Sequence, residues 1–183
     1  MSDSLKERGR SLEEAFFKKE ESKQLEGHRK KLQVNELAEA SGLDNTKALA
    51  PLVDLGVTAD TIAAIALVPL IHVAWADGEM QENERKAILE AADEKGIKND
   101  SPAHQLLDSW LDERPKATLF AAWSEYIGAL KDEVDDKALA ELKESIASFA
   151  RDVAKSAGGF LGIKAVSGDE ERALDEVEKA FPS

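Results

Sequence analysis

Apolar residues in this chain recur every three or four positions, and an alternation with period two is found nowhere in the sequence. A spacing of three or four places side chains on one face of an α-helix, whereas a strand requires alternation. Glycines, prolines and capping residues divide the pattern into about eight or nine segments. The sequence therefore predicts an all-α protein, a helical bundle of about 8–9 helices.

The most apolar segment lies at about residues 59–76. Apolar residues cover every side of this segment, and a helix of that kind is enclosed by other helices. Pro69 removes one backbone donor, so the helix should bend near Ile65, whose carbonyl would lose its partner. We therefore expect the bundle to form around a buried central helix at this position.

The N-terminal part of the chain is far more polar than the rest. Residues 1–10 are predicted to be disordered, and a capping-box pattern at Ser11 is expected to begin a charged helical arm at 11–33. Asn35 should then cap a separate short helix. The apolar face of the arm is narrow, so the arm should dock through a few side chains or pair with another chain. Residues 34–183 are predicted to form a single helical domain.

Cap residues mark the helix starts in the rest of the chain. Ser, Asp and Asn before a helix accept bonds from its free N–H groups, and proline is favoured at the first helical position. The predicted starts lie near Gln81 with Glu84 as its partner, at Ser101-Pro102, at Asp135 or Asp136, and at Ser167 with Glu170 as its partner. Gly158-Gly159 should break the preceding helix, and FLGIKAV after it is predicted to be a short apolar connector.

Charge narrows the range of partners. The chain has 24 basic and 37 acidic residues, which gives a net charge of −13. Residues 1–33 hold nine basic and seven acidic residues, so the acidity belongs to the rest of the chain. Nucleic acids and anionic membrane surfaces need clustered Lys and Arg, so neither is an expected partner. The absence of cysteine excludes disulfides, thiol catalysis and thiolate metal sites.

Membrane insertion is also not expected. The N-terminus lacks the apolar region of a secretory signal. The longest apolar run is interrupted by Pro69 and His72 and is shorter than the roughly 20 residues that a spanning helix requires. We expect a cytoplasmic protein.

The stretch ELAEASGLDNTKALAPLVDLGV has the Ala-Ser-Gly turn of a helix-turn-helix. Its second helix would carry Asp44 and Asp54 and no arginine, which is unsuitable for contact with phosphates. A helical hairpin packed on the bundle explains the pattern better.

An acidic turn follows the apolar segment. Counting Asp77 as position 5 of an EF-hand loop places Gly78 at position 6 and Glu84 at position 12. Positions 1 and 3 would then be Val73 and Trp75, which offer no oxygen ligand. The turn is thus at most half of a calcium loop. The alternative is structural: Asp77 accepts from turn amides, Gly78 ends the helix in the left-handed conformation, and Glu84 completes a cap.

The stretch AWADGEMQENERKAILEAADEKGI resembles the signature of the TerB-like family, named for a tellurite-resistance protein. The similarity is specific over residues 74–97. It implies an all-helical bundle with an acidic site able to bind a metal ion, and a role in stress response. By this resemblance Asp77 and Glu84 are the candidate metal residues, with Glu79 and Glu82 as their neighbours, and the cation is Ca²⁺ or another divalent ion.

Two hypotheses of function follow. The first is a non-catalytic binding or scaffold module in which the 77–84 turn binds a divalent cation or a basic surface. The alternative is a protein-interaction or oligomerisation module that uses the arm at 11–33, with the turn purely structural. No catalytic constellation and no small-molecule substrate are indicated, so an enzyme is not expected. His72 could act beside Asp77, although a buried histidine bonded to a backbone carbonyl is more typical.

Overall fold

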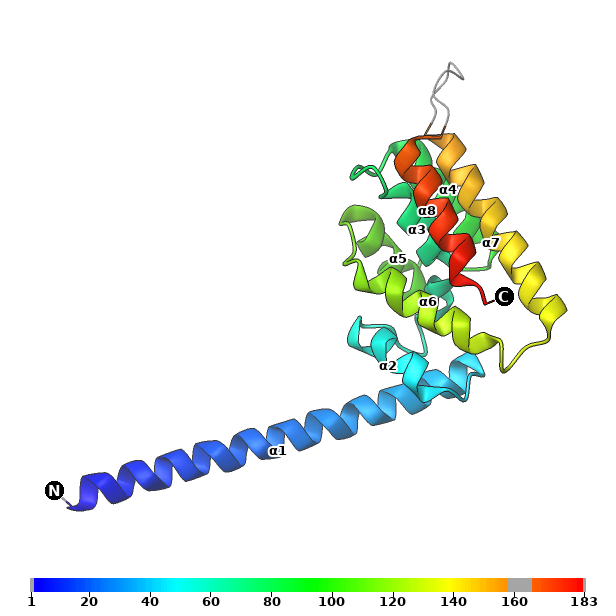
Figure 1. The fold of residues 1–183 in the computed structure, drawn as a ribbon. Helices are drawn as coiled ribbons and strands as arrows, with labels where there is room; N and C mark the ends of the chain where they lie inside the picture. Colours follow the sequence, from blue (N-terminus) through cyan, green and yellow to red (C-terminus); the bar gives the residue numbers. More distant parts are fainter. Residues whose placement is uncertain (1, 158–165, 183) are drawn as a thin grey trace.

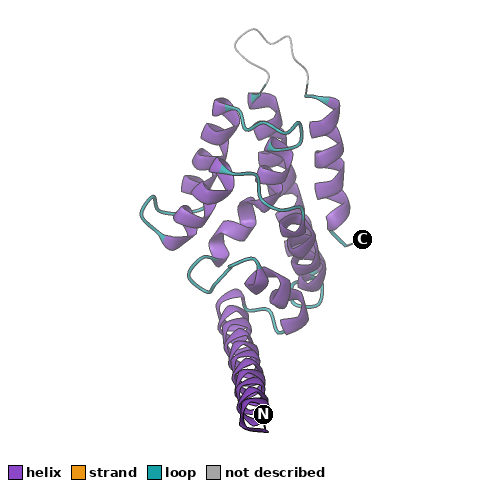
Figure 2. Ribbon diagram, turned by 90° about the vertical axis from the view of Figure 1, so that its left-hand side faces the viewer, coloured by secondary structure: helices purple, strands orange, loops and turns teal. Residues whose placement is uncertain are grey.

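The computed structural model describes residues 2–157 and 166–182, with side chains from Glu13 onward. This part of the chain contains eight α-helices and one 3₁₀ helix and no strand, which confirms the all-α prediction (Figure 2). The elements are α1 (Ser2–Ser41), α2 (Thr46–Asp54), the 3₁₀ helix η1 (Ile62–Leu67), α3 (Val68–Ala74), α4 (Glu82–Glu94), α5 (Pro102–Asp112), α6 (Thr118–Leu130), α7 (Asp136–Ser156) and α8 (Gly168–Ala180). None of the described helices is both long and apolar enough to cross a membrane.

Helix α3 is short but packs against many other elements. It contacts η1, α4, α6, α7 and α8, and the long helices α7 and α8 lie beside it in the upper part of the molecule (Figure 1). The side chains of Leu70, Ile71 and Val73 are buried. A helix this short has little stability of its own, so its position depends on these neighbours.

The apolar segment is two elements and not the single helix expected at 59–76. Its first half is the 3₁₀ helix η1, and α3 begins at Val68 with Pro69 in its first turn. The missing N–H of a proline costs no hydrogen bond at that position. The expected loss of a partner at the Ile65 carbonyl is wrong, because that carbonyl accepts a bond from the Val68 N–H.

The N-terminus is a single helix of 40 residues. The expected helix starts at Ser11 and Asn35 are wrong, since both residues lie inside α1. The segment that was expected to be disordered, residues 1–10, continues this helix from Ser2 onward. Lys, Glu, Arg, Gln, Leu and Ala, which dominate the sequence here, are strong helix formers, and a cap residue inside such a run does not interrupt it.

Only the C-terminal end of α1 is packed on the bundle (Figure 1). Val34 and Leu37 are buried there, and the Lys30 Nζ lies 2.6 Å from an Asp54 carboxylate oxygen at the end of α2. Helix α2 in turn contacts α6. The predicted helical hairpin on the bundle is present, with α1 as its much longer member.

Helix starts in the second half lie where the cap residues predicted them. The Ser101 hydroxyl accepts from the His104 N–H at 3.2 Å, and the Asp135 carboxylate accepts from the Ala138 N–H at 2.8 Å. Ser167 and Glu170 form a reciprocal capping box. Gly158-Gly159 and the connector FLGIKAV, apart from its final Val166, lie outside the described residues.

Candidate functional site

The acidic turn after α3 has the geometry of a capped helix end. Gly78 has a φ of +96°, in the left-handed region where only glycine is unstrained, and its N–H donates to the Trp75 carbonyl at 3.1 Å. The Asp77 carboxylate accepts from the Glu79 N–H at 3.0 Å. The carboxylate of Glu84 accepts from the Gln81 N–H at 2.9 Å, as the N3 residue of α4. The expected roles of Asp77 and Glu84 and the left-handed conformation of Gly78 are confirmed. Helix α3, however, ends at Ala74 with Trp75 as its C-cap, so Gly78 closes the turn after the helix and does not end the helix itself.

The four candidate metal residues do not share one environment. Asp77, Glu79 and Glu82 are exposed, whereas Glu84 is only 1% exposed. Within the described part of the chain, no group of three or more His, Asp or Glu side chains is arranged to hold a metal ion. The geometry adds no support to a divalent-cation site, which stays a prediction.

The cation hypothesis has a direct test. If the turn binds Ca²⁺ or Mn²⁺, either ion at millimolar concentration should raise the melting temperature by mass action, and Asp77→Asn should abolish that rise. Differential scanning calorimetry with and without a chelator measures it. A melting temperature that is independent of the ion would leave the turn with its capping role alone.

Glu84 has a partner that its sequence position does not reveal. Its carboxyl group lies near the carboxyl group of Glu170, whose negative charge raises the pKa of Glu84, and these two are the buried charged side chains of the described chain. Each is the N3 residue of a capping box, one at the start of α4 and the other at the start of α8. Two carboxylates that lie close together and are buried repel each other, which favours the neutral, protonated form of one of them.

The Glu84 carboxyl group keeps its proton up to a higher pH than an exposed glutamate does. Burial raises the pKa of the Glu84 carboxyl from 4.5 to about 7. The hydrogen bond from the Gln81 N–H lowers this pKa, whereas the nearby negative charges of Glu170 and Asp77 raise it further. A carboxylic acid that is half protonated near neutral pH is therefore held between two helix N-termini.

His72 does not have the environment expected for it. It was expected to bond a backbone carbonyl, but its Nε2 lies 2.7 Å from the Glu176 carboxylate, 104 residues away in the sequence. Its ring stacks on Phe120 with the centroids 3.8 Å apart and an angle of 10° between the planes. The side chain is partly exposed and borders a cavity, so it belongs to a surface site and not to the core.

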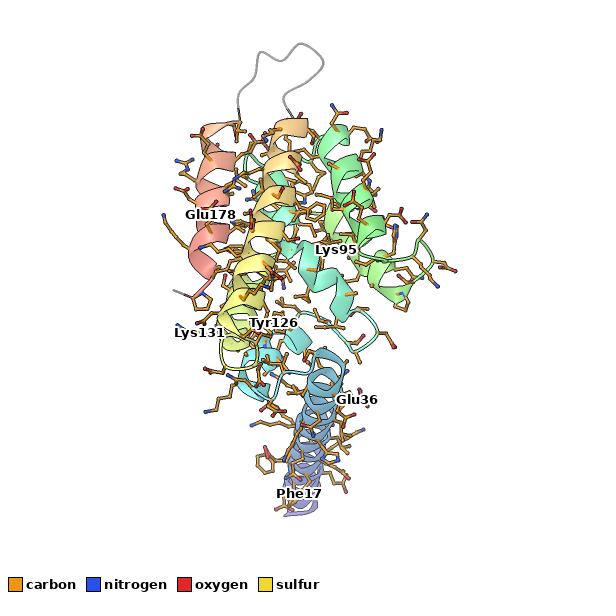
Figure 3. The ribbon with its side chains drawn as sticks, turned by 90° about the vertical axis from the view of Figure 1, so that its right-hand side faces the viewer. Phe17, Glu36, Lys95, Tyr126, Lys131 and Glu178 are labelled. Atoms are coloured by element: carbon orange, nitrogen blue, oxygen red, sulfur yellow. The ribbon has the colours of Figure 1, made fainter. Side chains whose placement is uncertain are left out.

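The arm at 11–33, whose side chains are described from Glu13 onward, is the other candidate surface. Five large hydrophobic side chains are exposed among the described residues, and four of them lie on this arm: Phe16, Phe17, Leu25 and Leu32. The side chain of Phe17 is drawn on the arm well away from the bundle (Figure 3). Phe16 and Phe17 form an edge-to-face pair with centroids 6.1 Å apart. The sequence predicted Phe16, Phe17 and Leu25 as docking side chains, but the exposure of Leu32 and the isolation of all four from the bundle are visible only in the structure.

A search of protein-family models, of curated proteins and of solved structures finds no match to this chain, so the site is interpreted from its own geometry.

Proposed function

We propose that this protein is a protein-interaction module that self-associates through the arm of α1, in the cytoplasm. The observation that carries the proposal is the concentration of exposed large hydrophobic side chains on a helix segment that projects from the bundle and contacts it only near its base, through Lys30 and Asp54. Phe16, Phe17 and Leu25 are each more than 60% exposed. Burial of such a side chain contributes about 1.5–3 kcal/mol, so a partner that covers several of them can form a stable complex.

Charge favours a second copy as the partner. The arm carries six basic and five acidic residues, whereas residues 34–183 carry fifteen basic and thirty acidic residues. The arm is thus the one long segment of the chain that the acidic body of another copy does not repel. Neither the divalent-cation site nor the resemblance to the TerB-like family is needed for this proposal.

The arm does not have the pattern of a simple coiled coil. At 100° per residue, Leu25 and Leu32 fall on one side of α1, and Phe16 falls on the opposite side from Leu25. A two-stranded coiled coil requires one continuous apolar seam with period 3.5. The arm therefore offers two separate apolar surfaces, one at the phenylalanine pair and one at the leucine pair.

Replacement of the four exposed arm residues by glutamine should abolish self-association. Glutamine is polar and retains helix propensity, so the arm stays helical while its apolar surface is lost. We expect the dissociation constant of the oligomer to rise by about 100-fold or more. Each apolar side chain that is no longer buried at the interface raises this constant by a factor of at least about ten. Sedimentation equilibrium of the full chain measures the mass against the 19.9 kDa monomer.

Val134→Gln is the matched control, because Val134 is the fifth exposed large hydrophobic residue and lies outside the arm. It should leave the mass unchanged. A full chain that is monomeric at concentrations of a few hundred micromolar would contradict self-association.

A further inference from the structure

A cavity of about 360 Å³ opens on the bundle between α3, the loop from α5 to α6, and α8. This volume is within the range of ligand-binding sites. The lining residues are mainly apolar or aromatic, with a few charged groups: Val68, Ile71, His72, Trp75, Arg114, Pro115, Lys116, Ala117, Leu119, Phe120, Ala121 and Glu176.

Aromatic rings with fixed orientations form part of the wall. Phe120 is held between His72 and Trp123, with ring centroids 3.8 Å and 5.3 Å away. The Trp75 indole N–H donates to the Trp110 carbonyl at 2.9 Å, so that ring is also held in place. Aromatic rings that are already ordered bind another ring without an entropic cost of their own.

Charged residues of both signs line the cavity. Arg114 and Lys116 lie on the loop, both exposed, and neither forms an ion pair with any other described side chain. Glu176, on α8, is already paired with His72. The cavity thus offers two cationic side chains without an ion-pair partner next to an apolar and aromatic lining.

The outermost part of the arm whose side chains are described, residues 13–19 and called the tip below, carries the complementary sequence. Glu13 and Glu14 precede the exposed pair Phe16 and Phe17, and Lys18-Lys19 follows it. Along the helix this gives an anionic turn, two adjacent aromatic rings and a cationic turn. Two carboxylates next to an aromatic pair complement the two unpaired cations and the aromatic lining of the cavity.

The arm of a chain cannot reach its own cavity. Helix α1 is continuous from Ser2 to Ser41 and points away from the bundle (Figure 1). Phe16 lies about 27 Å along the helix axis from Val34, the first residue of α1 that is buried against the bundle, at 1.5 Å per residue. An intramolecular contact would require a break in this helix, so the occupant of the cavity has to come from another chain.

We propose that the Phe16-Phe17 tip of one copy docks in the cavity formed by α3, the α5–α6 loop and α8 of a second copy, with Glu13 and Glu14 beside Arg114 and Lys116. This inference rests on the proposed self-association and assigns the surface that receives the arm. If each arm of a pair enters the other copy, the complex is a closed two-fold dimer in which the same contact occurs twice.

A charge-exchange experiment tests the assignment. Arg114→Glu with Lys116→Glu should raise the dissociation constant of the full chain by about 30-fold, since two attractive pairs become repulsive. Glu13→Lys with Glu14→Lys should weaken association to a similar extent. The chain with all four substitutions should associate to within about threefold of the original chain, because the charges are complementary again. Lys47→Glu with Lys98→Glu, an equal change in net charge on exposed residues outside the cavity, should have little effect.

A mixing experiment shows whether the contact joins two chains. The chain with Phe16→Gln and Phe17→Gln retains an intact cavity, and the chain with Arg114→Glu and Lys116→Glu retains an intact arm. Each should be largely monomeric alone, and their mixture should associate through the one intact pair of surfaces. Sedimentation velocity with one chain labelled measures this.

Two results would overturn the inference. If reversal of Arg114 and Lys116 leaves association intact while the four glutamine substitutions on the arm abolish it, the arm docks elsewhere and the proposed function stands without this surface. If 3-phenylpropionate binds in the cavity of the original chain but does not compete with association, the cavity is a site for small aromatic carboxylates. A chain that is monomeric throughout contradicts both this inference and the proposed self-association.

Discussion

Glu84→Gln should stabilise the protein at pH 8 by about 3 kcal/mol and should have almost no effect at pH 4. The pKa of Glu84 rises from 4.5 to about 7 on folding, and each unit is worth about 1.4 kcal/mol. Glutamine resembles the protonated acid: its carbonyl can accept from the Gln81 N–H, and its amide can donate to Glu170. The variant therefore avoids the cost of holding a buried carboxylate.

The direction of the pH dependence follows from proton uptake. Between pH 4.5 and about 7 the folded protein binds a proton on Glu84 that the unfolded chain has already lost. The free energy of unfolding therefore falls as the pH rises through this window, and it levels off outside the window. In the glutamine variant this part of the pH dependence should be absent. Urea unfolding between pH 4 and pH 8 measures the difference.

Glu82→Gln is the matched control, because Glu82 lies in the same first turn of α4 and is exposed. It should change the free energy of unfolding by less than about 0.5 kcal/mol at every pH. A stability difference for Glu84→Gln that is the same at pH 4 and pH 8 would show that Glu84 does not titrate in this range.

Trp123→Ala should destabilise the protein by about 3–5 kcal/mol, the usual cost of removing a large aromatic side chain from a core. Trp123 is completely buried, lies near Phe120 in a stacked arrangement and meets the edge of Phe181 at a centroid distance of 5.9 Å. It therefore connects α6 to the segment that follows α8. Its loss should also loosen the wall of the cavity that contains Phe120.

Trp123→Phe separates packing from polarity at the same position. The Trp123 indole N–H is buried and has no hydrogen-bond partner, so phenylalanine removes an unpaired donor along with part of the ring. This variant should lose less than half as much stability as the alanine variant.

Phe17→Ala, which removes an exposed aromatic side chain, is the control and should change the free energy of unfolding of the monomer by no more than about 0.5 kcal/mol. Chemical unfolding at low protein concentration compares the three variants.

Much of the fold follows from local chemistry. Ser101, Asp135 and Ser167 mark helix starts correctly because a cap forms between residues three positions apart. The same reasoning fails at Ser11 and Asn35, where the helix formers on both sides outweigh one cap residue. A local signal predicts a helix boundary only where the flanking residues also favour one.

The candidate site is less predictable, because its essential contacts join distant parts of the chain. The sequence identifies Glu84 and Glu170 as members of two capping boxes, and both roles are confirmed. It contains no sign that these two side chains meet each other. The pair formed by His72 and Glu176 is likewise a consequence of how α3 and α8 pack. Tertiary packing brings these groups together, and the hydrophobic periodicity of the sequence does not predict these contacts.

Anchoring of α1 at one end makes its tip sensitive to small rotations at its base. With about 27 Å of helix between Val34 and Phe16, a rotation of about 10° at the base moves the aromatic pair by about 5 Å. The direction of the helix is set by Val34, Leu37 and the Lys30–Asp54 ion pair against α2. Substitutions at this base could thus change the direction of α1, and with it the geometry of the assembly, without changing any residue that contacts the partner.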